Sequence, residues 1–210
     1  MGTPAFAVAS LNALLQAKMN VVGVVTAPDK PAGRGMQLQQ SAVKQFALAH
    51  DLPILQPEKL KSPEFFEALK QWKPDLQVVV AFRMLPEVVW KMPPLGTFNL
   101  HGSLLPAYRG AAPINWAIIN GESKSGVTTF FLDEKIDTGL IIQQAELNIQ
   151  KEWTAGELHD AMMPIGATLV VDTVHAIFNG GSTVQPQNGK LATHAPKLNK
   201  ENCQLDFTKY

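Results

Sequence analysis

The most polar stretch of the chain, residues 98–110, places an amide and an imidazole two positions apart, at Asn99 and His101. Alternate side chains of a β-strand project from the same face, so both groups would face one ligand. Together they can polarise a carbonyl group and stabilise charge on its oxygen. Gly102 would let the backbone approach that ligand, and Pro106 would end the extended segment. The same pattern also fits a polar pair at a strand end that does no chemistry.

A second candidate site is the acidic segment 132–139, which contains Asp133, Glu134 and Asp137. Its Asp-Thr-Gly sequence matches the signature of the aspartic proteases, but those enzymes need two such aspartates sharing a proton, and this chain has one. A cation-binding loop would use the carboxylates, although their spacing does not match an EF-hand. The residue types are equally those of a surface turn.

A third candidate is the loop 26–35, which is rich in glycine and proline and carries Lys30 and Arg34. Two cations in such a loop could bind a phosphate backbone or a nucleotide. The loop lacks the Gly-Lys-Ser/Thr ending of a Walker loop, so it is not a nucleotide-binding P-loop of that type. The alternative is a solvated, flexible loop.

These groups need a scaffold, and apolar runs that alternate with helical patterns predict one. We expect strands at 21–25, 76–82, 97–100, 127–132 and 140–144, and helices at about 5–18, 40–50, 62–72, 113–120 and from Thr154 to the pair Gly180–Gly181. Continuous apolarity in the strands indicates that both faces are covered. Alternating strands and helices favour an open, mostly parallel α/β sheet, and the short connections of the later strands favour a mixed sheet at one edge.

Helix ends are marked by capping residues. Ser62 is expected to cap a helix that starts at Pro63, and Thr154 with Glu157 matches a capping box. The chain enters its first helix directly from a Gly-Thr-Pro turn, without a preceding strand. Residues 182–210 are polar and irregular, which is typical of a linker or tail.

Composition excludes several classes of protein. Of 210 residues, 46% are hydrophobic and 17% charged, so the chain is not largely disordered. Its 18 basic and 18 acidic residues balance, which argues against a protein that only binds RNA. The single cysteine excludes an internal disulfide, no apolar run reaches transmembrane length, and the start does not match a secretory signal. The remaining histidines have no metal-ligand spacing, so we expect surface or helix positions for them and no metal site: His50, His159, His175 and His194.

Four segments together resemble the folate-dependent formyltransferases. The stretch from Asn99 to Gly110, continued by residues 111–114, resembles the central motif of that family, and the likeness extends through 126–128 to 137–139. Residues 78–86 are similar to its folate-contacting loop. Residues 28–35 are similar to the loop by which some members reach the acceptor stem of initiator tRNA.

The resemblance implies a Rossmann-like α/β fold of the formyltransferase type, an open and mostly parallel sheet whose first strand is missing here. It implies a catalytic domain at residues 1–181, and a linker at residues 182–210 that leads to a tRNA-binding β-barrel absent from this sequence. The implied reaction moves a formyl group from 10-formyltetrahydrofolate to the α-amine of methionyl initiator tRNA, leaving tetrahydrofolate. A cytoplasmic monomer that needs neither a metal nor a membrane is expected.

Roles for individual residues follow from the same resemblance. Asn99 would donate a hydrogen bond to the formyl oxygen, His101 would stabilise the oxyanion, and Asp137 would orient the histidine ring and support its positive charge. Lys30 and Arg34 would contact tRNA. The residues expected at the folate are Phe82, Met84, Leu85, Pro86, Ser103, Leu104, Leu105, Pro106, Asp133, Ile136 and Thr138.

The sequence leaves other functions open. A formyltransferase acting on a UDP-amino sugar shares the central motif, but it is not expected to carry the basic loop 31–35. A glycinamide ribonucleotide formyltransferase usually has proline after the histidine, where this chain has Gly102. Enzymes that hydrolyse the same folate usually carry an additional N-terminal domain. A non-catalytic folate-binding module is the alternative from a different functional class.

Overall fold

A computed structural model describes residues 1–32, 37–181 and 183–204. Its larger sheet runs in the order β5 (Gln77–Val80), β6 (Thr97–His101), β8 (Lys124–Phe131), β9 (Ile141–Asn148). Strands β5 and β6 are parallel, whereas β8 and β9 are antiparallel to their neighbours. A shorter sheet pairs β1 (Val24–Val25) in parallel with β4 (Ile54–Leu55). The predicted α/β sheet with a mixed edge is therefore confirmed.

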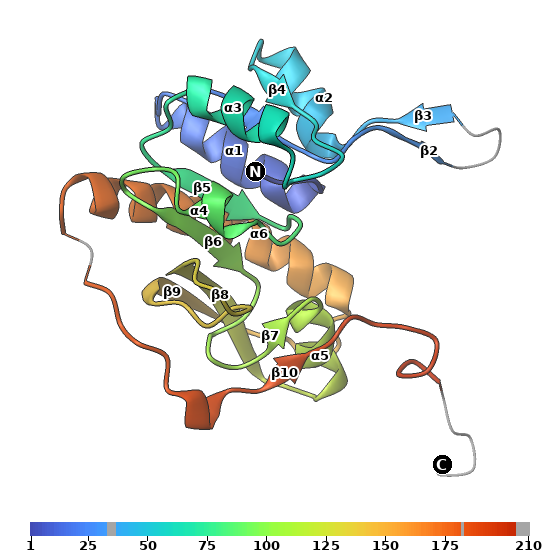
Figure 1. Ribbon diagram of the computed structural model, residues 1–210. Helices are drawn as coiled ribbons and strands as arrows, with labels where there is room; N and C mark the ends of the chain where they lie inside the picture. The colour runs from blue at the N-terminus through green and yellow to red at the C-terminus, as the bar shows by residue number, and fades with distance from the viewer. Residues whose placement is uncertain (33–36, 182, 205–210) are drawn as a thin grey trace.

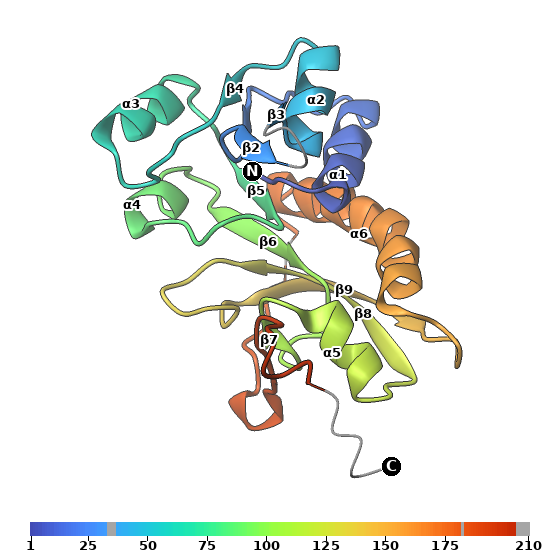
Figure 2. The same cartoon turned by 90° about the vertical axis from the view of Figure 1, so that its right-hand side faces the viewer.

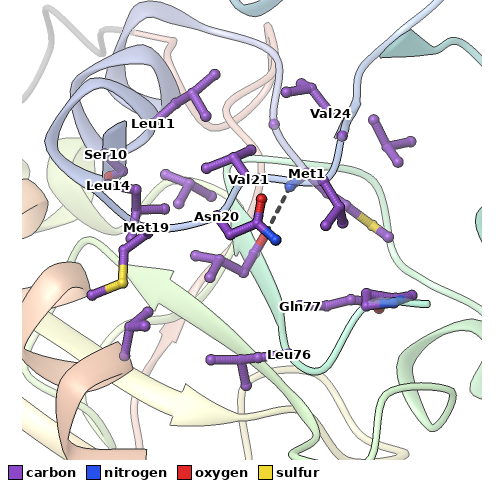
Figure 3. Close-up of a pocket in the computed structure, with 18 of the residues that line it drawn as sticks. Met1, Ser10, Leu11, Leu14, Met19, Asn20, Val21, Val24, Leu76 and Gln77 are labelled. Carbon is purple, nitrogen blue, oxygen red and sulfur yellow. Dashed lines mark hydrogen bonds between the residues drawn. The ribbon is translucent and has the colours of Figure 1, made fainter. Parts of the chain in front are cut away.

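The first residues of the chain lie in a slot between the two sheets and bond to both, beside the pocket drawn in Figure 3. The Gly2 N–H donates to the Val25 carbonyl, and the Val80 N–H donates to the Met1 carbonyl, at 3.0 and 2.9 Å. The α-amine of Met1 donates to the Val78 carbonyl at 2.6 Å. Beyond Met1 the slot continues as a cavity of about 400 Å³, lined mainly by apolar side chains of α1, β1 and β5.

Strand β1 is shorter than predicted. We expected a strand over residues 21–25, but only Val24 and Val25 form ladder pairs. Residues 21–23 line the cavity instead. The sequence pattern of a buried strand is therefore present where the pairing is not.

Helices cover both faces of the sheets (Figures 1 and 2). The helices are α1 (Ala5–Gln16), α2 (Ala42–Ala49), α3 (Pro63–Gln71), α4 (Glu87–Trp90), α5 (Pro113–Ile119) and α6 (Ala155–Phe178). On one face, α1 and α6 pack over Val80, Phe98 and Leu100. On the other face, α3 and α4 pack over Val25 and Val79. The predicted helices are all present, and α4 is an addition to them.

Helix α6 sets the direction of the polar side chains on β6. A Cβ atom at Gly166 would lie 2.9 Å from Leu100 Cδ2, so this glycine lets α6 approach the strand closely. Leu100 points toward α6, and therefore its neighbours Asn99 and His101 point to the other face. The capping box of Thr154 and Glu157 at the start of α6 is confirmed, as is the Ser62 cap of α3.

By length and composition alone, α6 could cross a membrane. In this structure its apolar side contributes to the core instead, through residues that include Leu158, Met162 and Val170. A long apolar helix at the centre of a globular domain has the same composition as a membrane span, so the composition is weak evidence.

Regular structure occurs in two segments that were predicted from the sequence to be a loop and a linker. Residues Lys30–Ala32 (β2) pair antiparallel with Gln37–Gln39 (β3), which forms a hairpin that projects from the body of the molecule (Figure 1). After α6, a 3₁₀ turn (Gly189–Leu191) is followed by β10 (His194–Ala195), which pairs in parallel with β7 (Arg109–Gly110). The segment after α6 is therefore packed against the domain as far as Ala195, and the boundary at residue 181 stays a prediction.

Candidate active site

Asn99 and His101 lie at the carboxyl end of β6, on the face away from α6. His101 is 6% exposed, and its Nε2 lies 2.9 Å from the Tyr108 carbonyl oxygen. A carbonyl only accepts hydrogen bonds, so Nε2 must carry a proton in this arrangement. The other ring nitrogen, Nδ1, is left to face the acidic loop.

Asp137 comes from that loop, which joins β8 to β9. Its Oδ2 lies 3.8 Å from His101 Nδ1 and accepts a hydrogen bond from the Gly110 N–H at 2.8 Å. Both ring nitrogens of His101 therefore face oxygen atoms, Nε2 at hydrogen-bond distance and Nδ1 across 3.8 Å. Asp137 itself has a φ of 55°, in the left-handed region that is costly for residues other than glycine. The resemblance implied this pairing despite the distance along the sequence, and the structure brings the three expected residues to one cavity.

The side chain of Asn99 is not satisfied within the protein. Its Oδ1 is buried and has no hydrogen-bond partner among the residues that the structure describes. A buried polar atom without a partner costs about 1–3 kcal/mol, so such an atom in a cavity wall is a place where a ligand gains affinity. Amide oxygen and nitrogen are assigned from their contacts, so either end of this amide can turn toward a ligand.

A cavity of about 660 Å³ opens in front of these three residues. Of the residues expected at the folate, those in its wall are Phe82, Met84, Leu85, Asp133 and Ile136. Pro86, Thr138 and the segment 103–106 do not line it. The volume suits a small-molecule ligand of cofactor size.

Residues 103–106 lie behind the cavity, where they fix the loop after β6. The Leu105 N–H donates to Thr128 Oγ1 at 3.1 Å, and Gln144 Nε2 donates to the Leu105 carbonyl at 3.0 Å. Ser103 Oγ donates to the Ala107 carbonyl at 2.6 Å, and Ser103 is fully buried. These polar groups are engaged with β8, β9 and the loop itself, so in this structure the segment supports the site from behind and does not line the cavity.

The acidic loop is also a turn held by internal hydrogen bonds, which is one of the structures that its residue types predicted. Thr138 Oγ1 donates to both carboxylate oxygens of Asp133, at 2.7 and 2.8 Å, and the Lys135 N–H donates to one of them. A Cβ atom at Gly139 would lie 1.7 Å from the Phe131 carbonyl oxygen, so only glycine fits where the loop returns to β8. Turn chemistry thus shapes the loop that presents Asp137.

The loop after β5 forms another part of the wall. It begins at Ala81, whose φ of 47° is in the left-handed region, and this sharply turns the chain out of the sheet. The Arg83 guanidinium donates to the carbonyls of Pro57 and Glu58, at 2.6 and 3.0 Å, and so ties the loop to the segment after β4. Met84 remains 67% exposed beside the cavity.

The basic loop has an anchored base. Lys44 Nζ lies 2.5 Å from the Asp29 carboxylate, and Gln56 Nε2 donates to the same group at 2.8 Å. The hydrogen bond from Lys44, and then that from Gln56, lower the pKa of Asp29 below its usual value. Lys30 is exposed on β2, and Arg34 lies outside the described residues.

Several wall residues were not foreseen. Pro4, Phe6 and His159 come from the start of α1 and from α6, and Trp90 comes from α4. His159 was expected to be a surface or helix histidine. It is on α6, with its ring 5.1 Å from that of Phe6 and at the cavity wall. No local signal marks these residues, because tertiary packing brings them to β6: that of α1 on α6 for Pro4, Phe6 and His159, and that of α4 for Trp90. Over the described parts of the chain, no group of three His, Cys, Asp or Glu side chains is arranged to hold a metal ion.

Comparison with known proteins gives a consistent result. The family model described as formyl transferase matches residues 1–174. The chain is 58% identical to a methionyl-tRNA formyltransferase of Flavobacterium johnsoniae over 211 residues, which is 100% of this chain and 67% of the relative. It is also 58% identical to that of Bacteroides fragilis, over 99% of this chain and 65% of the relative. The chain thus spans about two thirds of the length of these relatives.

Solved structures show the same fold at low identity. A glycinamide ribonucleotide transformylase from Symbiobacterium toebii superposes with a TM-score of 0.73 at 18% identity, over 89% of this chain and 92% of that protein. An N-formyltransferase from Helicobacter canadensis, solved with folinic acid and dTDP-3-aminofucose, gives 0.73 at 24% identity, over 98% of this chain and 73% of its own. The Rossmann-like fold of the formyltransferase type is confirmed.

Proposed function

Because the chain belongs to the formyl transferase family, we propose that it transfers a formyl group from 10-formyltetrahydrofolate to the α-amine of methionyl initiator tRNA. The observation that carries the proposal is the meeting of Asn99, His101 and Asp137 at the mouth of one cavity. Two of these side chains can donate hydrogen bonds, and the third is an anion behind the histidine. That set matches a reaction in which negative charge develops on a carbonyl oxygen.

The donor supplies a formyl carbonyl, and attack by the amine forms a carbon–nitrogen bond while the bond from the formyl carbon to folate nitrogen 10 breaks. The amine loses one proton, and nitrogen 10 gains one as tetrahydrofolate leaves. The amide of Asn99, which lacks a partner at Oδ1, turns its NH₂ toward the formyl oxygen. His101 lines the same cavity, and when the substrate binds its Nε2–H turns from the Tyr108 carbonyl to that oxygen and stabilises the charge on it.

Asp137 acts on the other side of the histidine. At 3.8 Å from Nδ1, its carboxylate orients the histidine ring and leaves room for small adjustments when substrate arrives. The Gly110 N–H keeps the carboxylate turned toward His101. Asp137 also relays the amine proton through water.

The folate occupies the cavity between two loops in this proposal. Phe82 and Leu85 form an apolar wall on the β5 side, and Ile136 forms one on the side of the acidic loop. Apolar walls with a few converging polar groups are typical of small-molecule sites. Pro86, Thr138 and residues 103–106 support these loops from outside the wall, and direct folate contact by them stays a prediction.

The tRNA is held by the projecting hairpin and by parts of a longer protein. Lys30 is exposed on β2, while the position of Arg34 stays a prediction. The ion pair of Asp29 with Lys44 holds the base of the hairpin against α2. Residues 182–210 lead toward a tRNA-binding domain in the proposal. The cytoplasmic location, the monomeric state and independence from metal ions stay predictions with it.

The deciding experiment measures transfer from 10-formyltetrahydrofolate to two acceptors in parallel, methionine-charged initiator tRNA and a UDP-4-amino sugar. The chain is tested as given and joined to the remainder of its coding sequence. We expect formylation of the tRNA alone, and a loss of roughly 100-fold in Asp137→Asn. Asp172→Asn, an exposed carboxylate on α6, is the matched control and should keep full activity.

Other outcomes would point to the alternatives. Formylation of the sugar alone would replace the acceptor in the proposal and remove the role given to Lys30. Folate binding without transfer to either acceptor, in the full-length protein, would favour a non-catalytic binding module.

A further inference from the structure

Gln187 stands out in the segment that follows α6. Between Thr183 and Leu191 it is the residue whose side chain is partly buried, while its neighbours are exposed. Its Nε2 donates to the carbonyls of Asp137 and Gly139, at 3.0 and 2.8 Å. Its Oε1 accepts from Nε and Nη2 of Arg109, at 3.0 and 2.6 Å. One side chain thus makes four hydrogen bonds to two other segments.

Those two segments are the ones that hold the His101–Asp137 pair. Arg109 belongs to β7, whose next residue, Gly110, donates its N–H to the Asp137 carboxylate. The same strand is held from the other side by β10. Gln187 therefore closes a ring of contacts that runs from Arg109 through Gly110 and Asp137 back to itself.

Asp137 needs such support, because its backbone is in the left-handed region at a φ of 55°. A residue other than glycine keeps that conformation only when surrounding contacts offset its cost. The bond from Gln187 reaches the carbonyl of Asp137 itself, and a second bond reaches the carbonyl of Gly139. These bonds fix the backbone on both sides of Thr138 and so the direction of the Asp137 side chain.

We propose that Gln187 is a positioning residue of the active site, which holds the Asp137 carboxylate opposite His101 by tying the acidic loop to Arg109. The inference rests on the proposed function and adds a residue from outside the three motifs. Gln187 touches neither the cavity nor the reacting atoms, so it acts through Asp137.

The side-chain amide is the group that this position requires. It accepts hydrogen bonds from a guanidinium through its oxygen and donates to carbonyls through its nitrogen. In Gln187→Glu the bonds to Arg109 are kept, but a carboxylate then faces the carbonyls of Asp137 and Gly139. In Gln187→Met the length of the side chain is nearly kept and all four bonds are lost.

The first test compares kcat and KM for formyl transfer in the wild type, Gln187→Met and Gln185→Met. Gln185 lies two residues earlier, is exposed, and pairs with Ile141 through its backbone, so its variant is a matched control. We expect kcat to fall roughly 10- to 100-fold in Gln187→Met, because sub-ångström misplacement of a catalytic group has effects of this size. The KM for folate should change less than about threefold, since uniform binding is untouched.

A double-mutant cycle separates positioning from a general structural role. If Gln187 acts through Asp137, then Gln187→Met should change kcat by less than about twofold in an Asp137→Asn background. Equal effects in both backgrounds, or a kcat for Gln187→Met equal to that of Gln185→Met, would overturn the inference.

A second measurement does not depend on activity. The Gly110 amide reports the placement of Asp137 directly, because it is bonded to that carboxylate. We expect its hydrogen exchange to be roughly tenfold faster in Gln187→Met than in Gln185→Met. Absence of transfer by the wild type would count against the proposed function, and the exchange of Gly110 would still decide whether Gln187 places Asp137. Unchanged exchange at Gly110 would overturn the inference.

Discussion

In a polypeptide that begins at Met1, the buried α-amine of that residue gives a pH-dependent stability that can be calculated. Burial in the slot between β1 and β5 lowers the pKa of this amine from 8.0 to about 5. The folded chain therefore binds the proton more weakly than the unfolded chain does. A difference of about three pKa units corresponds to about 4 kcal/mol between the two protonation states.

The sign of the effect follows from which state carries more protons. Between pH 5 and 8 the unfolded chain is protonated at the amine and the folded chain is not, so the free energy of unfolding rises with pH across this range. Above about pH 8 the amine is neutral in both states and the cost is absent. Below about pH 5 it is charged in both states and the full cost of about 4 kcal/mol is present.

Urea unfolding at intervals from pH 5 to 8.5 measures this directly, with the N-acetylated chain as the matched control. Acetylation removes the titrating amine but leaves an N–H for the Val78 carbonyl. The histidines and carboxylates titrate alike in both forms, so the difference between the two curves isolates the amine. Because pH 8 and pH 5 coincide with the two pKa values, we expect the acetylated form to lose about 3 kcal/mol less on going from pH 8 to 5. Parallel curves would refute the assignment of a buried, neutral amine.

Three further substitutions test the site and its supports. In His101→Ala, kcat should fall roughly 100- to 1,000-fold with folate affinity nearly unchanged, because the contact is made mainly in the transition state. The control is His175→Ala, on the exposed side of α6. An equal loss of folate affinity in His101→Ala would contradict the role. In Lys30→Ala, the KM for tRNA should rise about 3- to 10-fold at low salt and the KM for folate should stay the same; a shift in both would place Lys30 at the folate instead. In Gly139→Ala, the free energy of unfolding measured by heat or urea should fall by about 3 kcal/mol, since a Cβ there would overlap a backbone carbonyl. In the control Gly181→Ala, the Cβ meets no atom within 4 Å, and the free energy of unfolding should change by less than about 1 kcal/mol. Similar losses in both variants would show that close packing is not the cause.

Much of the fold was predictable because local rules and tertiary packing agree along most of the chain. The capped helices α3 and α6 begin where their Ser62 and Thr154 caps indicate. The predicted strand at 21–25 is shorter than its pattern, because pairing depends on a neighbouring chain that the pattern cannot register. The hairpin β2–β3 was missed because Pro31 and the adjacent glycines are residues of turns rather than of strands.

The active site likewise combines residues that the sequence predicts with residues that only the fold brings into place. A period of two places Asn99 and His101 on one face from sequence alone, whereas their meeting with Asp137 was supplied by resemblance and is visible only in the fold. Leu105 belongs to a polar motif, yet its backbone is bonded to β8, behind the cavity. Gln187 escaped notice because its partners are far away in sequence and its own surroundings are those of an irregular segment.

The distance along the chain between the partners of this site has a consequence for folding. Gln187 meets Asp137 across 50 residues and Arg109 across 78, and the Tyr108 N–H reaches Thr193 Oγ1 across 85. Closing long loops delays contact formation, and synthesis delivers residue 187 after α6 is complete. A nascent chain that ends at α6 therefore carries Asn99, His101 and Asp137 before the contacts that orient them exist. We therefore expect the His101–Asp137 arrangement to be completed only after residues 187–195 have left the ribosome.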